Sequence, residues 1–220
     1  MAVKATRRYE SPRRAEQAQQ TRAAVTDAAK RLFLRDGFAA TTVAAVAAEA
    51  GVSVETIYKG FGGKPGLVRA ICTTELAGGE QRTHQPLTEP DPRAIIQGWG
   101  SLSAAVAPRV APILLLLRAA ATTDPAMAGL QAEMDAGRLR RMTRNASHLA
   151  EAGHLRDGIT VQHAAEIMWA YTSPELYEML VLARSWPLHR YSDFIADAVI
   201  AALLPPSPGA VTGLGPDLGD

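Results

Sequence analysis

Apolar residues recur every three or four positions along most of the chain, and glycines interrupt this pattern at short intervals in its first third. Val25, Ala28 and Leu32 belong to the first apolar series, which Gly37 ends. This spacing places apolar side chains on one face of a helix, and a glycine just past the last apolar residue often ends a helix. The pattern therefore predicts an amphipathic helix over about 16–36.

Two short helices and the start of a longer one are predicted next. A threonine pair at 41–42 is placed to cap a helix that Gly51 ends, and Ser53 is placed to cap the helix after it. Serine and threonine are favoured at this position because their hydroxyl accepts from a free backbone N–H. Glycines in 60–63 end the second short helix, and Lys64-Pro65 begins the next, over 64–77, because proline suits the first helical turn.

The remainder of the chain is also predicted to be helical. The segment 78–92 has no periodic pattern, so we expect a mobile linker there. Further helices are predicted over 93–106, 108–122, 125–150, 160–172, 174–185 and 191–204. The pairs Asp124-Pro125 and Ser173-Pro174 are typical of a cap followed by a first helical turn. Proline interrupts helices, so a kink or break is expected between Pro108 and Pro112. Strand signals are absent from the sequence, and the predicted fold class is all-α.

Composition favours a folded protein of the cytoplasm. Hydrophobic residues make up 47% of the 220 residues and charged residues 20%, which excludes disordered and collagen-like chains. The single cysteine, Cys72, allows no internal disulfide and no zinc spacing. The longest aliphatic run, 113–117, is far shorter than the ~20 residues of a membrane span. We therefore expect a soluble protein without a membrane partner, with a flexible basic arm (1–15) and a disordered tail (205–220).

Charge is distributed unevenly along the chain. Residues 1–71 hold 12 Lys or Arg and 6 Asp or Glu, a net +6, although the whole chain carries only +1. Residues 72–220 hold 11 and 16, a net −5. A basic first segment on an acidic remainder indicates a polyanionic partner for the first segment alone.

The glycine-rich stretch "TIYKGFGGKPG" (56–66) does not fit a nucleotide-binding loop. A phosphate-binding loop needs a glycine where Tyr58 stands and a hydroxyl where Pro65 stands, and it follows a strand. A dinucleotide fingerprint fails too, because Lys64 or Pro65 occupies the required glycine positions.

Motifs for catalysis are missing as well. The sequence has no nucleophile elbow and no zinc-protease histidine pair. His163 and Glu166 lie three apart on a predicted helix, close enough to share a metal, but protein sites for such metals usually have three or more ligands. An ordinary surface pair is the simpler interpretation, and we expect no enzyme activity, no cofactor and no metal.

Residues 42–64 instead have the layout of a helix-turn-helix. Two short capped helices meet at Gly51, with small residues, Ala47 and Ala50, where the helices cross and with Val52 and Ile57 facing inward. The glycine provides the left-handed backbone of the turn. In this motif the second helix enters the major groove of DNA, which is about 12 Å wide.

The same residues resemble the signature of TetR-type transcriptional repressors. The resemblance is dense over about residues 20–71, through Thr42, Val46, Ala47, Ala50, Gly51, Val52, Ser53, Thr56, Ile57, Tyr58, Phe61, Lys64 and Leu67. A weaker similarity, to the carboxyl domain of many actinobacterial members, covers 153–180. The resemblance implies a three-helix DNA-binding domain (16–71) followed by a larger helical ligand-binding and dimerisation domain (72–204). It also implies a homodimer that binds a near-palindromic operator on double-stranded DNA and is released by a small molecule.

The resemblance also implies which residues contact DNA. They are Val54, Glu55, Thr56, Tyr58 and Lys59 on the predicted reading helix, with Thr42, Lys64 as a phosphate contact, and Arg22 on the first helix. Gly60 departs from the family, which often has a polar residue there. Glu55 is unexpected on a DNA-facing helix; it either accepts from a cytosine amine or stabilises the helix amino terminus, and we favour the second role.

Effector and dimer residues follow from composition and apolar stripes. Methionine and aromatic side chains suit an adaptable apolar pocket, although such a stripe is more often plain core. The candidate effector residues are Trp99, Met127, Met134, Glu166, Met168 and Trp169. Glycines on both sides of Trp99 indicate either close packing or room beside the indole. The candidate dimer residues are Leu176, Met179, Leu180, Ala183, Phe194, Val199, Ile200 and Leu203.

The predicted function is therefore a ligand-responsive repressor. The alternative is an architectural DNA-binding dimer without a sensing function. The two differ in whether the body of the protein accepts a ligand and whether one DNA sequence is preferred over random DNA.

Overall fold

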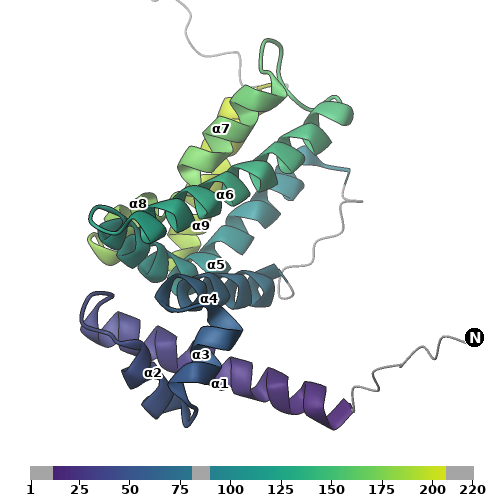
Figure 1. The fold of residues 1–220 in the computed structure, drawn as a ribbon. Helices are drawn as coiled ribbons and strands as arrows, with labels where there is room; N and C mark the ends of the chain where they lie inside the picture. Colours follow the sequence, from purple (N-terminus) through teal and green to yellow (C-terminus); the bar gives the residue numbers. More distant parts are fainter. Residues whose placement is uncertain (1–11, 81–89, 207–220) are drawn as a thin grey trace, which may run out of the picture. The chain divides into compact units, whose positions relative to one another are not determined.

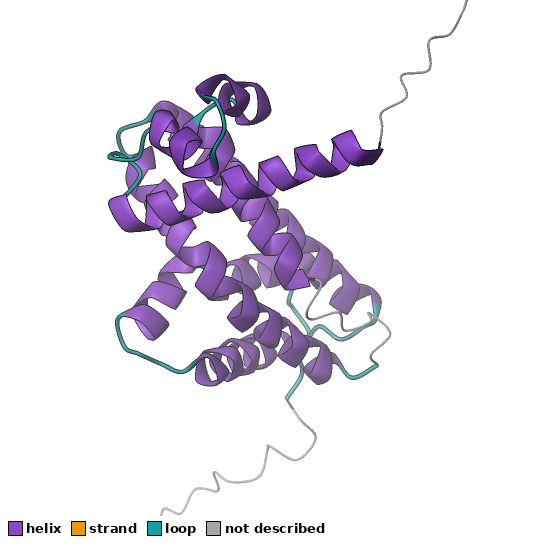
Figure 2. Ribbon diagram, turned by 90° about the horizontal axis from the view of Figure 1, so that it is seen from below, coloured by secondary structure: helices purple, strands orange, loops and turns teal. Residues whose placement is uncertain are grey.

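A computed structural model describes residues 12–80 and 90–206, and these fold into helices joined by short connections (Figure 1). The helices are α1 (Pro12–Asp36), α2 (Val43–Ala50), α3 (Val54–Phe61), α4 (Lys64–Glu80), α5 (Pro92–Ala121), α6 (Pro125–Glu151), α7 (Val161–Tyr171), α8 (Pro174–Tyr177), a π-helical turn η1 (Glu178–Leu182) and α9 (Leu188–Leu203). No strand occurs among the described residues (Figure 2). The all-α prediction is confirmed.

Several predicted boundaries move. Helix α1 begins at Pro12, inside the predicted basic arm, because proline is well suited to a first helical position. Helix α4 continues to Glu80, into the predicted linker. The predicted helix over 174–185 is one α-helical turn followed by η1, which ends at Leu182. The first eleven residues, 81–89 and 207–220 lie outside the described residues.

The predicted break between Pro108 and Pro112 is wrong, because the two predicted helices form one helix, α5. The helix runs from Pro92 to Ala121 through both Pro108 and Pro112. Each proline removes one helical hydrogen bond at a cost of about 3 kcal/mol. Burial of the neighbouring Val110, Ile113 and Leu117 favours the continuous helix and offsets this cost.

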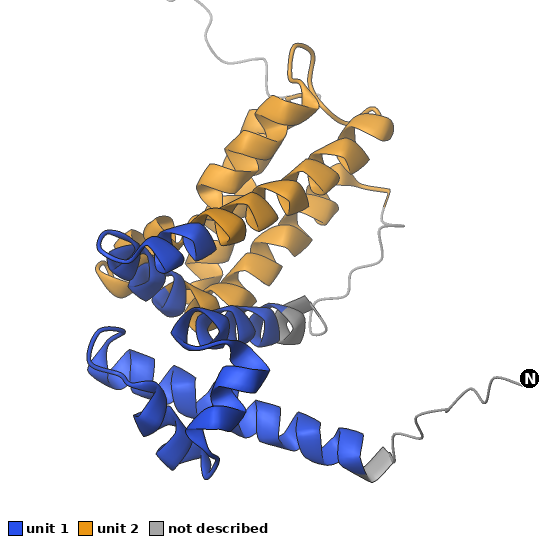
Figure 3. Ribbon diagram, in the orientation of Figure 1, with its two compact units in different colours: residues 1–76, 112–131 blue, residues 77–111, 132–220 orange. Residues whose placement is uncertain are grey.

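The chain divides into two compact units (Figure 3). Unit 1 contains the described residues up to Leu76 together with Pro112–Gln131, and unit 2 contains the rest. Helices α5 and α6 therefore each contribute to both units. The sequence prediction of two consecutive domains did not include the return of 112–131 to the first unit.

Unit 1 is organised around the apolar face of α1. Its buried residues are Val25, Ala28, Ala29, Leu32 and Phe33 of α1, Val46 and Ala47 of α2, Ile57 of α3, Leu67, Val68, Ala70, Ile71 and Cys72 of α4, and Ile113, Leu117, Met127 and Leu130 from the ends of α5 and α6. Burial raises the pKa of the Cys72 thiol to about 12, which keeps it protonated and unreactive at neutral pH.

Unit 2 has its own core, in which α5 and α9 approach closely. A Cβ atom added to Gly100 of α5 would lie 2.7 Å from the Ser192 carbonyl oxygen and 3.1 Å from the Ala196 Cβ of α9. Of the two explanations for the glycines beside Trp99, close packing therefore holds at Gly100. Other core residues include Ile96, Ala104, Met142, Ala146, Leu149, Ala165, Met168, Tyr177, Tyr191, Ile195, Val199 and Leu203.

Helix α5 is also long and apolar enough, by length and composition alone, to cross a membrane. The sequence analysis predicted two helices, 93–106 and 108–122, and neither is long enough alone. Joined in one helix, they reach the length of a membrane span. Core helices pass the same test, and α5 buries Ile96 in unit 2 and Leu117 in unit 1. Arg109 and Arg118 stand within it, and arginine is costly inside a bilayer. We interpret α5 as a core helix.

Replacing Gly100 by alanine is expected to destabilise the protein by about 1–2 kcal/mol. Overpacking against the α9 backbone costs about 1–3 kcal/mol, which exceeds the gain of about 1 kcal/mol from removing a helical glycine. Gly129, on the exposed surface of α6 with nothing within 4 Å of an added Cβ, is the control. Gly129→Ala is expected to leave stability equal or higher by up to about 1 kcal/mol. Urea unfolding followed by circular dichroism measures both, and equal stabilisation by the two variants would contradict the close α5–α9 approach.

Candidate nucleic-acid interface

Hydrogen bonds close both ends of α2, at Thr42 and at the turn into α3. The Thr42 hydroxyl accepts from the Ala45 N–H at 3.0 Å and caps α2. Gly51 adopts a left-handed backbone with φ of 67°, and the next N–H, of Val52, donates to the Ala47 carbonyl at 3.0 Å. This conformation favours glycine over any residue with a Cβ atom. The geometry is that of the predicted helix-turn-helix.

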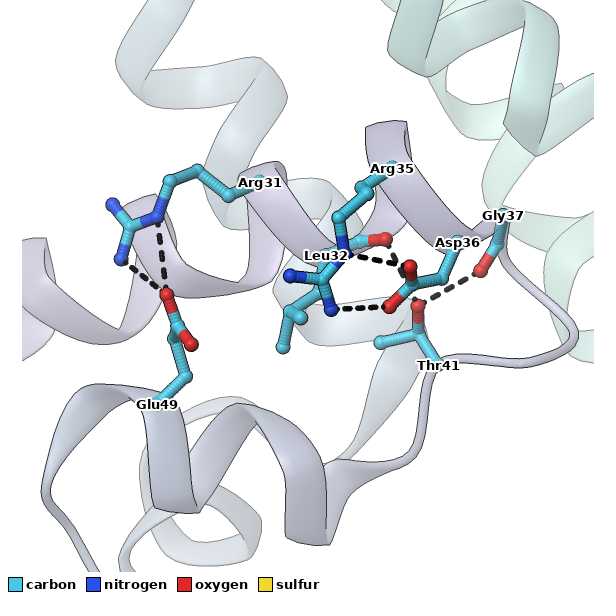
Figure 4. Close-up of polar contacts among 7 residues, drawn as sticks. All are labelled: Arg31, Leu32, Arg35, Asp36, Gly37, Thr41 and Glu49. Atoms are coloured by element: carbon cyan, nitrogen blue, oxygen red, sulfur yellow. Dashed lines mark hydrogen bonds and ion pairs between the residues drawn. The ribbon is translucent and has the colours of Figure 1, made fainter.

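A buried threonine ties the end of α1 to the start of α2. The Thr41 side chain is 2% exposed, and its hydroxyl lies 2.8 Å from the Gly37 carbonyl oxygen and 3.2 Å from that of Leu32 (Figure 4). On the surface, Arg31 of α1 donates to the Glu49 carboxylate of α2 at 3.1 Å. The sequence prediction considered Thr41 only as an alternative cap, because nothing local in the sequence indicates its burial.

Helix α3 is sharply two-sided. Ile57 is fully buried, whereas Tyr58 is 56% exposed and Val54 is 40% exposed. The Ser53 hydroxyl accepts from the Thr56 N–H at 3.1 Å and caps the helix. All the α3 residues predicted to contact DNA, namely Val54, Glu55, Thr56, Tyr58 and Lys59, are exposed. The structure therefore brings them together on one short helix.

Glu55 has an immediate partner on the same helix. Its carboxylate lies 2.7 Å from the Lys59 ammonium, one turn along, and both side chains are largely exposed. It also stands in the first turn of α3, where a negative charge favours the helix dipole. The geometry agrees with the stabilising role that we favoured for Glu55.

Two cations predicted to contact DNA have partners within the domain. Arg22 of α1 donates to the Gly60 carbonyl at 3.2 Å and lies over the Phe61 ring, 4.6 Å from its centroid. Lys64 donates to the Phe38 carbonyl at 2.5 Å and lies 4.2 Å from the centroid of the Phe38 ring. Each cation therefore combines a carbonyl hydrogen bond with a cation–π contact.

These contacts add a structural role for Arg22 and Lys64 to the predicted DNA contacts, which stay predictions. Arg22 holds the last turn of α3, where a positive charge also favours the helix dipole. Partial burial lowers the pKa of the Lys64 ammonium, and Asp124 opposes this effect. One of the three ammonium hydrogens of Lys64 is used by Phe38, which leaves two for a phosphate.

The four glycines between residues 60 and 66 differ in what requires a glycine. Gly62 and Gly63 have positive φ values, of 74° and 109°. A Cβ atom on Gly66 would lie 1.6 Å from the Phe61 carbonyl oxygen, so α4 can begin against the end of α3 only without a side chain there. Gly60 has open space around an added Cβ. The sequence prediction missed Gly66 because its close approach is a tertiary property.

The candidate effector residues do not form one cluster. Met127 is buried in unit 1, whereas Trp99, Met134, Glu166, Met168 and Trp169 belong to unit 2. Met168 is in the core of unit 2, with Trp99 and Trp169 half-buried against it. Glu166 is exposed and accepts from the Gln162 amide at 3.0 Å.

The candidate dimer residues divide by exposure. Val199 and Leu203 are buried within unit 2. Leu176, Leu180 and Ile200 are half-buried, and Met179, Ala183 and Phe194 are exposed. Exposed Leu182 and Leu188 lie close in sequence to this second group; Leu182 belongs to the same predicted apolar stripe as Met179, whereas Leu188 was not predicted. We refer to Met179, Leu182, Leu188 and Phe194 as the η1–α9 apolar patch.

Sequence comparisons match the first segment of the chain. Residues 25–71 match the family described as bacterial regulatory proteins, tetR family. A 56-residue segment is 46% identical to the HTH-type transcriptional regulator TtgR of Pseudomonas putida, and equally to the probable HTH-type transcriptional regulator ArpR of the same species. The segment covers 26% of this chain, and the match spans only 27% of the length of each relative.

Structural comparisons extend over most of the chain. A SmeT–triclosan complex has a TM-score of 0.65 at 22% identity, covering 90% of this chain and 99% of that one. SmeT is the repressor of the Stenotrophomonas maltophilia multidrug efflux pump SmeDEF. A TetR-family regulator from Rhodococcus sp. has a TM-score of 0.69 at 19% identity, covering 84% and 99% of the two chains. At these identities the similarity establishes the fold.

Thr41→Val tests the buried connection between α1 and α2. The replacement keeps the shape and removes the hydroxyl, which leaves two carbonyls without this donor, and we expect a loss of about 1–2 kcal/mol in stability. Thr73→Val is the matched control, because Thr73 is exposed on α4 and its hydroxyl bonds only its own helix. Thermal unfolding measures both variants. If Thr41→Val costs no more than Thr73→Val, the hydroxyl does not hold the two helices together.

Proposed function

We propose that the protein is a transcriptional repressor, because it carries the DNA-binding domain of a TetR-type regulator and has the fold of that family over most of its length. The protein binds a near-palindromic operator as a homodimer and leaves it when a small molecule binds. The observation that carries the proposal is the two-sided α3, with Ile57 fully buried and Tyr58 more than half exposed.

The DNA contact follows from what α3 offers. Thr56, Tyr58 and Lys59 provide hydroxyl and ammonium groups on an exposed helix of a size that fits the major groove. The ring of Tyr58 lies beside Gly63, whose added Cβ would be 3.5 Å from Tyr58 Cε1. The net +6 of residues 1–71 attracts the phosphate backbone.

Two copies of the chain give the operator its symmetry. One helix-turn-helix reads a single half-site, and a dimer reads two half-sites about 34 Å apart, or multiples of that distance. The η1–α9 apolar patch, with Ala183 and the half-buried Leu176, Leu180 and Ile200, is the proposed contact between copies. Val199 and Leu203 support that surface from within the core.

Release by a small molecule is proposed as a change of population. The ligand favours a state of the dimer in which the distance between the two α3 helices does not match the distance between the half-sites. Helix α4 transmits this change from unit 2 to the DNA-binding helices. The chain passes from unit 1 to unit 2 within α4, after Leu76. The relatives support this view, since SmeT has been solved with triclosan and is the repressor of an efflux pump. Ligand and operator must weaken each other by the same factor.

A selection experiment tests the proposal. Duplexes bound from a random pool are expected to share a near-palindromic sequence and to bind at least about a thousandfold more tightly than random DNA at the same salt. Equal binding to all duplexes would instead support the alternative, an architectural dimer without sensing. Adjacent genes in the genome would then indicate the effector class. We place DNA binding and ligand sensing in the cytoplasm, where the chromosome is accessible.

Tyr58→Ala is expected to weaken operator binding by about tenfold or more, because the side chain is lost from the reading surface. Stability should change by less than about 0.5 kcal/mol, since the side chain is exposed. Leu139→Ala, which removes another exposed apolar side chain, on α6, is the control and should bind DNA normally. Gel shift and thermal unfolding of the same preparations measure the two effects. Normal binding by Tyr58→Ala would show that α3 is not the reading helix.

The salt dependence of DNA affinity distinguishes a proposed phosphate contact, Lys59, from a cation that stabilises α3, Arg22. Lys59→Gln is expected to reduce the slope of log affinity against log salt by about 1 per protomer, because a phosphate contact is lost. Arg22→Gln should lower affinity by roughly fivefold, the equivalent of about 1 kcal/mol, through a loosened α3, with the slope unchanged. Fluorescence anisotropy at several salt concentrations measures both. A reduced slope for Arg22→Gln would identify Arg22 as a phosphate contact.

A further inference from the structure

The indole of Trp169 carries a buried donor without an acceptor. Trp169 stands in the last turns of α7, half-buried against the core of unit 2. Its Nε1 atom is buried, and no described residue accepts a hydrogen bond from it. An unsatisfied buried N–H costs about 1–3 kcal/mol, so such a donor calls for an explanation.

A buried cation lies directly against the same indole. The Arg138 guanidinium of α6 is 4.3 Å from the centroid of the Trp169 ring, and it donates to the Trp169 carbonyl. Its side chain is only 11% exposed, and its carboxylate partner, Asp135, is 3.5 Å away and far more exposed. The largely buried guanidinium therefore lies against the indole whose N–H has no acceptor among the described residues.

The charges around Arg138 do not compensate its burial fully. Burial lowers the pKa of the Arg138 guanidinium, Asp135 and Glu175 raise it, and the like charge of Arg141 lowers it further. The net direction is downward, so the positive charge is disfavoured at this position. A negatively charged oxygen beside Arg138 would reverse that balance.

The surrounding side chains suit an apolar body attached to such an oxygen. Met142 and Met168 lie in the same core, and the Thr172 hydroxyl, which donates to the Met168 carbonyl, lies 3.9 Å from the Met142 sulfur. Methionine side chains repack around different shapes at low cost. Trp169 itself is only half-buried, although its Nε1 atom is buried, so a ligand that enters here displaces neighbouring side chains.

We infer that the effector is an amphipathic anion, a carboxylate or phenolate on an apolar body, whose oxygen accepts from Trp169 Nε1 beside Arg138. That this anion acts as the effector rests on the proposed function. The anion-binding site itself is argued only from the contacts of Trp169 and Arg138. A purely structural role, in which Arg138 only caps the end of α7, explains the carbonyl contact and leaves the indole N–H unexplained.

The test observes the indole directly in the full-length protein. The chain has three tryptophans, so its ¹⁵N spectrum contains few indole N–H signals, and Trp169→Phe identifies that of Trp169. The probes are 2-naphthoate and decanoate, each with a cation of matched shape, 2-naphthylmethylammonium and decylammonium. Trp186→Phe is the matched control, because Trp186 also stacks on an arginine, Arg190, at 3.9 Å.

At least one of the anions is expected to move the Trp169 signal downfield in a saturable way, and neither cation should do so. Calorimetry should show binding weakened about tenfold or more in Trp169→Phe, with Trp186→Phe unchanged, because a hydrogen bond to a charged group is lost. The inference is overturned if neither anion shifts the signal, if the cations shift it equally, or if Trp169→Phe binds as tightly as the unaltered protein.

A gel shift separates this result from the fate of the proposed function. Trp169→Phe should bind the selected duplex normally, and the active anion should release the unaltered protein from DNA but not this variant. If no duplex is preferred, the repressor proposal fails while the indole signal still decides the anion site. If DNA binding is specific and the anion shifts the indole without releasing DNA, the site is not an effector site.

Discussion

The burial of Ile57 is the constraint on which the proposed DNA-binding surface depends. A helix as short as α3 contributes one fully buried side chain to the core of unit 1, and that side chain fixes the rotation of the helix about its axis. Thr56 and Tyr58, on either side of Ile57, must then face away from the core. The caps at Thr42 and Ser53 and the left-handed Gly51 hold α2 and α3 at the angle that this burial requires. The packing of Ile57 therefore decides which α3 side chains are exposed and available for the proposed DNA contact.

The basic side chains of this domain fall into two groups, those held by other residues of the domain and those free to meet a phosphate. Arg22 and Lys64 fasten the ends of the α3–α4 connection to carbonyls and aromatic rings. Lys59, by contrast, is paired only with exposed Glu55 in the described structure, a pair worth little in water and readily exchanged for a phosphate. The difference lies in the neighbours and not in the residue type, so a count of basic residues in the sequence identifies the charge of the domain but not its contacts.

Local signals made much of the fold predictable. Asp124 and Ser173, singled out as caps, do accept from backbone N–H groups at the starts of α6 and α8, because capping depends on a few adjacent residues. Tertiary effects were not predictable. Core burial keeps α5 whole through Pro108 and Pro112, and Gly66 is required by a carbonyl of the preceding helix. Along α3 the spacing of apolar residues was sufficient to predict which residues are exposed. The partners of Arg22 and Trp169 lie on other helices, and a single sequence does not show which helices pack together.

Hydrogen–deuterium exchange of the full-length protein, with and without a selected duplex, tests the central claim most directly. If α3 is the reading helix, DNA should slow exchange most strongly in 53–63, with smaller effects at the start of α2. Residues 138–144 of α6, which include four arginines, should exchange at the same rate in both states. Protection concentrated on α6, with α3 unchanged, would contradict the account.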